Sequence, residues 1–235
     1  MLMVEILDFG CGDGFRAEVL GRRGRYWGVD VLQDNIRRAK EQYPSHLFKL
    51  IDGVKLPFPD GYFDEIYAYD VLEHVDNLET VLEEIMRCLK NSGKFVTEVP
   101  AQISEEYLLK IAPDYWKEVG HVRIIDDNVI NAVITKYDLK ILKKQRKKGI
   151  DNILLVYYLK TGKHIIGQTG KFMAENMFMR RLEYLFSEDF FQTKLFRSLI
   201  LLWVLFPVWL LTQPIGKVLS AIFPKSIHYE FCRNN

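Results

Sequence analysis

A glycine-rich turn directly after an apolar segment is the feature that most constrains the fold of this chain. Residues 3–8 are typical of a short buried strand, and Gly10, Gly12 and Gly14 follow it at once. Glycine tolerates positive φ and carries no Cβ, so the chain can turn tightly there and a ligand can approach the backbone. A strand that leads through such a turn into a helix is typical of an α/β protein that binds a nucleotide-like ligand.

The first two thirds of the chain alternates short apolar runs with amphipathic segments, which predicts a mostly parallel sheet covered by helices. We expect strands at 3–8, 26–31, 46–51, 63–69 and 94–99, helices at 15–20 and 34–43, a helix capped by Asp76, a helix from Asp126 or Asp127 to about 136, and a closing strand pair at 139–143 and 153–159 joined by a basic turn. Residues 101–120 break the alternation and are either a substrate lid or a surface helix with aromatic contacts.

Three acidic residues follow three successive predicted strands. Asp8 stands two residues before the first glycine, Asp30 ends the second strand and Asp52 follows the third. A carboxylate in the second position can accept hydrogen bonds from both hydroxyls of a ribose. The dinucleotide pattern GxGxxG is not met, because Phe15 stands where its third glycine belongs.

Four segments carry a resemblance to one family. Residues 8–14, DFGCGDG, resemble the E/DxGxGxG motif of class I S-adenosylmethionine (SAM)-dependent methyltransferases. LPFPDGYFD at 56–64, VLEHV at 71–75 and GHVR at 120–123 resemble segments of the subgroup that includes many small-molecule and quinone methyltransferases. The resemblance spans roughly residues 1–160. It implies an α/β, Rossmann-like sheet that is parallel with one antiparallel strand, and we expect a C-terminal apolar helical region beyond it.

The resemblance also implies SAM as the cofactor and assigns its contacts. The cofactor-binding residues it implies are Asp8, Gly10, Cys11 and Gly12 at the methionine end, Asp30 at the ribose, Val31, Asp52 and Gly53 at the adenine, and Tyr69 and Asp70 near the sulfonium. Family members usually carry helices before the first strand, whereas about four residues precede it here. Either residues 101–120 and the C-terminal region cover the pocket, or the chain starts late.

Methyl transfer from a sulfonium needs mainly positioning and desolvation, but a hydroxyl acceptor must also lose its proton. His74, in the segment after the fourth strand, is the first candidate for that catalytic role, and His121 is the second. The alternative for each is a structural histidine bonded to the backbone. Glu73 with His74 could bind a metal, but the sequence offers no further ligand and we expect none.

A long uncharged run, residues 198–216, sets the C-terminal part of the chain apart. As a helix it would extend about 28 Å, close to the hydrocarbon thickness of a bilayer. Trp203, Trp209, Arg197 and Lys217 fit interfacial anchors, whereas Pro207 argues against one straight span. We expect membrane contact through residues 195–223; the alternative is a buried helical cap on a soluble protein.

Composition limits the remaining possibilities. A net charge of +1 gives no general attraction to nucleic acid, and no [DN]PP[YF] stretch follows the fourth strand. Cys11, Cys88 and Cys232 lie far apart without CxxC spacing, as in a cytosolic protein with free thiols.

We expect a methyltransferase domain at 1–160 and a membrane-associated helical region at 161–235. The predicted activity is methylation of a small-molecule, lipid or lipid-linked acceptor, at a hydroxyl, at the cytoplasmic membrane face. The alternatives are a soluble small-molecule methyltransferase with a helical cap or dimerisation tail, or a non-catalytic SAM-binding protein.

Overall fold

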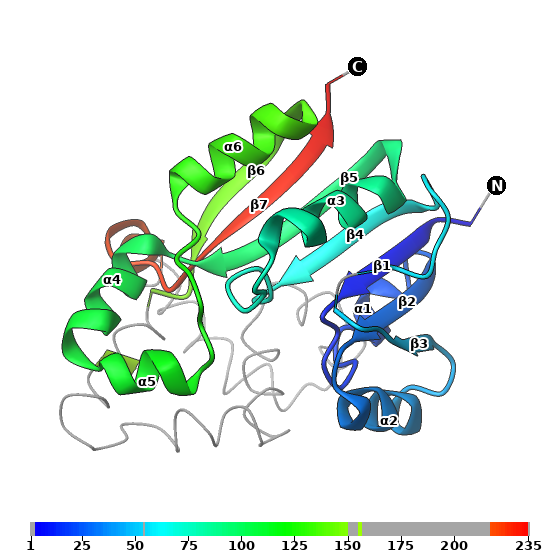
Figure 1. The fold of residues 1–235 in the computed structure, drawn as a ribbon, viewed down its shortest axis with the longest axis horizontal. Helices are drawn as coiled ribbons and strands as arrows, with labels where there is room; N and C mark the ends of the chain where they lie inside the picture. Colours follow the sequence, from blue (N-terminus) through cyan, green and yellow to red (C-terminus); the bar gives the residue numbers. More distant parts are fainter. Residues whose placement is uncertain (1–2, 54, 150–154, 157–216, 235) are drawn as a thin grey trace, which may run out of the picture.

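The computed structural model describes residues 3–53, 55–149, 155–156 and 217–234, and its strands form one twisted sheet (Figure 1). The strand order is β3-β2-β1-β4-β5-β7-β6. The strands are β1 Glu5–Phe9, β2 Arg25–Asp30, β3 Leu47–Leu50, β4 Phe63–Tyr69, β5 Leu89–Pro100, β6 Leu139–Lys147 and β7 Ser226–Arg233. The helices are α1 Ala17–Leu20, α2 Gln33–Gln42, α3 Leu78–Cys88, α4 Gln102–Ile111, α5 Pro113–Glu118 and α6 Asp127–Tyr137.

The sheet is parallel from β3 to β5, and β7 runs antiparallel to both β5 and β6. The predicted Rossmann-like sheet with one antiparallel strand is therefore confirmed. Most of residues 153–159, predicted as the second strand of the closing pair, lie outside the described residues, and the two that are described, Leu155 and Val156, are helical. Ser226–Arg233 pairs with both β5 and β6. Both segments are rich in β-branched and aromatic residues, so periodicity could not separate them.

Helices cover both faces of the sheet. On one face α3 and α6 pack over a core that includes Phe63, Ile66, Phe95 and Phe231. On the other face α1 and α2 pack over Ile6, Tyr26 and their neighbours. The buried positions of α3 follow the apolar stripe that its sequence predicts, and they end where β5 begins.

The caps of two helices can be compared with their predictions. Asn77, not Asp76, caps α3, because its side chain accepts a hydrogen bond from the Thr80 N–H at 3.2 Å. Asp126 caps α6 and accepts from the Val129 N–H at 2.8 Å, as one of the two predicted candidates does. Two acceptors in neighbouring positions can each serve as a cap, and sequence alone does not choose between them.

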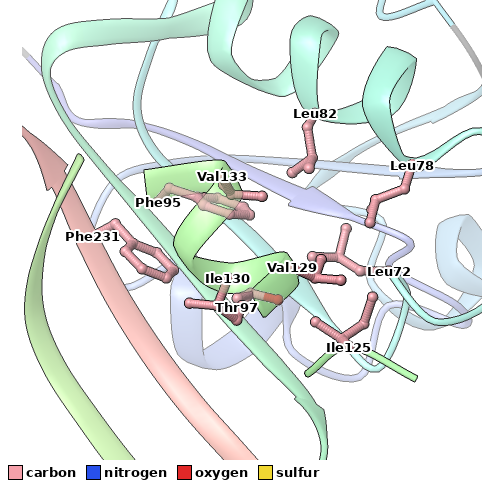
Figure 2. A pocket seen from close by; sticks show the side chains of 10 residues that line it. All are labelled: Leu72, Leu78, Leu82, Phe95, Thr97, Ile125, Val129, Ile130, Val133 and Phe231. Carbon is pink, nitrogen blue, oxygen red and sulfur yellow. The ribbon is translucent and has the colours of Figure 1, made fainter. Parts of the chain in front are cut away.

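Figure 2 shows a small cavity between α3, α6 and the sheet. Its volume is about 10 Å³, hardly the space of one water molecule. It is lined by Leu72, Leu78, Leu82, Phe95, Thr97, Ile125, Val129, Ile130, Val133 and Phe231. The one hydroxyl there, on Thr97, already donates to the Ala68 carbonyl at 2.7 Å. The cavity is therefore a gap in the apolar core and offers no ligand contacts.

Residues 101–120 form two helices, α4 and α5, on the side of the sheet to which β4 and β5 point (Figure 1). The start of α4 is tied to the segment that enters β7, because the Ala101 N–H donates to the Lys225 carbonyl at 2.8 Å and Ser104 bonds to the Pro224 carbonyl. The sequence left two alternatives for this segment, a substrate lid or a surface helix with aromatic contacts, and the segment is helical. Its helical form and its position beyond the strands are what the structure adds.

The basic run 143–148 is not the turn that the sequence predicted. Residues 143–147 lie in the outermost strand β6, and Lys148 follows the strand. Lys144 pairs with Asp127 at 2.9 Å and Lys147 with Glu98 at 3.4 Å. Lysines on an outer strand discourage pairing with another chain.

Most of the C-terminal region lies outside the described residues, including the uncharged run 198–216 and the predicted helices there. Among the residues that are described, we find no helix with the length and apolar character needed to cross a bilayer. The end of that region, Ser226–Arg233, belongs to the sheet that the sequence assigned to residues 1–160 alone.

Candidate active site

The glycine turn, residues 10–14, leaves β1 with positive φ at each glycine: +72° at Gly10, +57° at Gly12 and +80° at Gly14. The N–H groups of Gly10 and Cys11 both donate to the Val29 carbonyl at 2.9 Å, which fixes the turn against β2. A Cβ on Gly10 would come within 2.3 Å of the Val71 side chain, whereas a Cβ on Gly12 would meet nothing within 4 Å. The turn is thus packed below Gly10 and open at Gly12.

Asp30 is held against the open side of this turn. One carboxylate oxygen accepts from the Gly12 N–H at 2.9 Å, and the other accepts from the Leu32 N–H at 2.8 Å and the Asn35 side chain at 3.1 Å. These donors fix the carboxylate at the carboxyl end of β2, at the mouth of the crevice. The oxygen that accepts only from Gly12 has a further lone pair for a ligand hydroxyl.

Asp8 lies at the base of the same crevice and is fully buried. Tyr26 donates its hydroxyl to Oδ2 at 2.8 Å, while Oδ1 accepts no hydrogen bond from the described residues and has the Arg16 guanidinium 4.0 Å away. Burial raises the pKa of Asp8, and Arg16 and Tyr26 oppose that rise. A buried carboxylate oxygen without a donor is suited to receive a cationic amino group.

The remaining predicted cofactor residues surround the turn in different ways. Val31 is exposed and lies beside Gly53, where a Cβ would be 3.2 Å from the valine side chain. Asp52 is exposed and accepts from the Lys55 N–H at 2.9 Å. The structure thus places the predicted adenine residues together, next to Asp30. Cys11 differs, because its thiol is buried in the core and only its backbone faces the turn.

Tyr69 is the last residue of β4, and Asp70 follows it directly. The Tyr69 ring lies under the Arg16 guanidinium, with 4.7 Å from Cζ to the ring centroid, and stacks on His228 with 6.0 Å between ring centroids. Asp70 has a φ of +52°, and Lys148 approaches its carboxylate to 3.8 Å. The role of Arg16, which contacts both Asp8 and Tyr69, was not found from the sequence, because its position after the turn has no motif of its own.

His74 and His121 come together although 46 residues separate them. Their ring centroids are 4.9 Å apart. His74 Nδ1 lies 3.0 Å from the Gly120 carbonyl, and the Val122 N–H donates to the Glu73 carbonyl at 2.9 Å, so the segments 71–75 and 120–123 run side by side. Burial lowers the pKa of His74 and raises that of Glu73.

Glu105 on α4 is a further site residue that the sequence analysis did not find. Its carboxylate accepts from Trp116 Nε1 at 2.5 Å and contacts His121 Nδ1 at 2.6 Å. A carboxylate on this imidazole nitrogen holds the ring in one orientation and leaves Nε2 for other contacts. The residue had no recognisable pattern in the sequence because its partners lie 11 and 16 positions away.

Comparison with known proteins identifies this geometry. The family described as methyltransferase domain matches residues 7–97, from β1 to β5. A sterol 4-C-methyltransferase of Caenorhabditis elegans is 33% identical over 156 residues, 60% of this chain and 46% of that protein. A 2-methyl-6-phytyl-1,4-hydroquinone methyltransferase of a Synechocystis strain is 26% identical over 133 residues, 51% of this chain and 42% of that protein. The matches therefore span less than half the length of either relative.

A solved structure extends the comparison of the fold. The S-adenosylmethionine-dependent methyltransferase of Mesorhizobium loti superposes with a TM-score of 0.57 at 16% identity, and the alignment covers 98% of this chain and 91% of that one. The residues present fit SAM. The Asp8 oxygen that accepts no hydrogen bond from a described residue suits the amino group of SAM, and Asp30 suits its ribose. The space beside Gly12 lets the cofactor approach the backbone of the glycine turn. The chain carries a class I SAM-dependent methyltransferase domain, and SAM is the cofactor of that domain.

Proposed function

We propose that this protein methylates a hydroxyl of a lipid or lipid-linked small molecule at the cytoplasmic face of a membrane. The observation that carries the proposal is the pair His74 and His121, which stands just beyond the strand that ends at Tyr69. His74 is partly exposed, and its Nδ1 is taken up by the Gly120 carbonyl, so Nε2 can face an acceptor. A hydroxyl nucleophile requires such a group, whereas a neutral amine needs less help.

The chemistry is an in-line displacement. Bound SAM would supply an electrophilic methyl group whose leaving group is a neutral thioether. His74 Nε2 would take the proton of the acceptor hydroxyl as the new C–O bond forms. Asp8 and Asp30 hold the two ends of the cofactor, and the backbone of the glycine turn sets its depth in the crevice. The histidine pair lies where the proton is released.

A lipid acceptor is supported by two independent observations. By their names, the two curated relatives act on a sterol and on a phytyl hydroquinone, both lipophilic molecules. The uncharged run 198–216 is long enough to enter a bilayer. A catalytic domain tethered in this way would meet an acceptor that is dissolved in the membrane.

A carbon acceptor is the second candidate, because the name of the nematode relative specifies 4-C methylation of a sterol. The same lipid pool could supply it. A product methylated on carbon resists ether cleavage, and its mass fragmentation differs from that of a methyl ether. Analysis of the labelled product therefore separates the carbon acceptor from the hydroxyl acceptor.

The test uses the full-length chain, SAM with a labelled methyl group, and vesicles made from a total lipid extract. We expect label in the lipid fraction, on an oxygen, and co-flotation of the protein with the vesicles. His74→Gln should lower the turnover by about 10²-fold or more, while His46→Gln, on the far side of the sheet, should not. Label confined to water-soluble molecules would overturn the lipid assignment, and label on carbon would replace the hydroxyl.

A further inference from the structure

Three potential metal ligands meet at the histidine cluster, which comprises Glu73, His74 and His121. One ligand atom from each lies within 4.8 Å of the other two, and His74 Nε2 is 3.8 Å from Glu73 Oε1. The sequence analysis considered Glu73 with His74 and found no further ligand. The fold supplies that ligand, because residues 120–123 run alongside residues 71–75.

The outer nitrogen of each imidazole is already held. The Gly120 carbonyl lies 3.0 Å from Nδ1 of His74, and the Glu105 carboxylate lies 2.6 Å from Nδ1 of His121. Metal-binding histidines almost always donate their second ring nitrogen to a backbone carbonyl or a carboxylate, which fixes the tautomer and orients the ring. His74 has the carbonyl partner and His121 has the carboxylate partner. Nε2 of each ring is the nitrogen that would bind an ion.

Glu73 is the feature of this cluster that most needs a partner. Its side chain is 2% exposed, and no other described residue donates a hydrogen bond to either carboxylate oxygen. A buried carboxylate in this condition is costly unless a cation or a donor reaches it. His74 Nε2 lies 3.8 Å from Glu73 Oε1.

We propose that Glu73, His74 and His121 bind one divalent transition-metal ion. Two imidazole nitrogens and one carboxylate oxygen are the donor set of catalytic zinc sites and of facial iron(II) sites, and both leave coordination positions open. Ligands at 2.0–2.1 Å from a tetrahedral ion are about 3.4 Å apart, so the cluster needs to contract by about 1 Å. Rotation of the partly exposed His74 ring and the Glu73 carboxylate provides that movement.

The open positions give the ion a role at the acceptor, and this part rests on the proposed function. Residues 71–75, which include His74, lie next to the glycine turn. Val71 packs on Gly10, and the Val71 carbonyl accepts from the His74 N–H at 3.0 Å. An ion there would bind the acceptor oxygen and lower the pKa of its hydroxyl, so that the proton passes to water. The imidazoles would then activate the hydroxyl of the proposed function through the ion that they hold, in place of direct proton acceptance by His74.

The metal site can be tested without SAM or an acceptor. Full-length protein is stripped with a chelator, dialysed and titrated with Co²⁺, whose visible absorption reports nitrogen and oxygen ligation. We expect one Co²⁺ per chain, displaced by one Zn²⁺. Glu73→Gln, His74→Gln and His121→Gln should each weaken binding by more than about 100-fold, because loss of a direct ligand exceeds the 10- to 100-fold loss typical of an outer partner.

Two further variants calibrate the titration. Glu105→Gln removes the charge behind His121 and should weaken binding by about 10-fold. His46→Gln removes a histidine beside Tyr26 and Gly21, on the other face of the sheet, and should bind Co²⁺ like the unmodified chain. Far-UV circular dichroism and SAM affinity show that each variant is folded. Absence of stoichiometric binding by folded protein, or equal binding by the His74 and His46 variants, overturns the metal site.

The outcomes also separate this inference from the proposed function. Stoichiometric Co²⁺ binding without methyl transfer to a lipid hydroxyl supports the metal site and removes the proposed acceptor. Transfer to a hydroxyl that continues unchanged in chelator, with no Co²⁺ bound, supports the proposed function and overturns the metal site.

Discussion

The two halves of the sheet hold their functional residues in different ways. In the N-terminal half, β3-β2-β1-β4, the key contacts join residues close in sequence, such as Gly12 with Asp30 and Asp30 with Leu32. In the C-terminal half, β5-β7-β6, they join distant residues: Ser226 donates to Glu98 at 2.7 Å across 128 positions. The cofactor crevice is therefore a property of a short stretch of chain, and the acceptor side depends on the completed fold.

The largest expected effect tests the packed side of the glycine turn. Gly10→Ala places a Cβ 2.3 Å from a Val71 methyl and keeps a φ of +72°, so we expect about 3 kcal/mol or more of lost stability. Gly12→Ala has a similar φ but no neighbour within 4 Å, and it should cost only about 1–2 kcal/mol. Urea unfolding of both variants measures the difference, and Gly10→Ala with Val71→Ala should recover part of it. Equal losses would mean that the turn is not packed against Val71.

The next effect tests whether the N-terminal half alone determines cofactor binding. Asp30→Asn presents an amide N–H₂ to the Gly12 N–H or to the Leu32 N–H, and it removes the charge that we predict to bind the ribose. We expect SAM affinity by calorimetry to fall about 30-fold, equivalent to about 2 kcal/mol for hydrogen bonds to a charged group. Asp34→Asn is the matched control, because that exposed acid pairs only weakly with Arg37 on its own helix at 3.6 Å. A similar loss in both variants would remove the special role of Asp30.

The third prediction concerns acid stability of the C-terminal half. Lys148, Lys147 and Ser226 around Glu98 lower its pKa from 4.5 to about 2, despite its burial. A carboxylate with a lowered folded pKa contributes stability above its unfolded pKa and loses it as the pH falls toward the folded value. We expect unfolding free energy to fall by on the order of 2 kcal/mol between pH 5 and pH 2 from this residue.

Glu98→Gln should lack that part of the pH dependence, whereas Glu41→Gln, an exposed acid paired with Arg37 on α2, should keep it. Urea midpoints at pH 7, 5 and 3 provide the measurement. If Glu98→Gln and the unmodified chain lose stability in parallel on acidification, the distant contacts of the C-terminal half are not what holds it together.

The smallest effect lies where the two halves join, at the start of α3. Asn77→Ala removes the acceptor for the Thr80 N–H and should cost about 1 kcal/mol in thermal or urea unfolding. Asp76→Ala removes no cap and should stay within about 0.5 kcal/mol. The reverse ranking would restore Asp76 as the cap.

The sequence predicted the N-terminal half almost completely, and the physical reason is the short range of its interactions. The period of the strands, the glycine turn and the acids at strand ends are each visible within about 20 residues. The same approach identified His74 and His121 separately. It could not show that they meet, because that depends on how residues 120–123 pack beside residues 71–75.

The errors in the C-terminal half have a common origin. Residues 153–159 and 226–233 are equally suited to a strand, and only the pairing with β5 and β6 decides between them. Glu105 is a charged residue on a helix by sequence, and its burial at 3% exposure follows from contacts with Trp116 and His121. Local propensity carries no information about such partners.

The position of β7 between β5 and β6 has a consequence for how the protein is made. The ribosome releases β5 and β6 long before Ser226–Arg233 emerges, so a nascent chain holds two strands whose shared neighbour does not yet exist. Unpaired strand flanks are sites of misassembly during synthesis. The N-terminal half can fold during translation, while the other half is completed only after residues 226–233 have been synthesised. Chaperone dependence should therefore concentrate in that late interval.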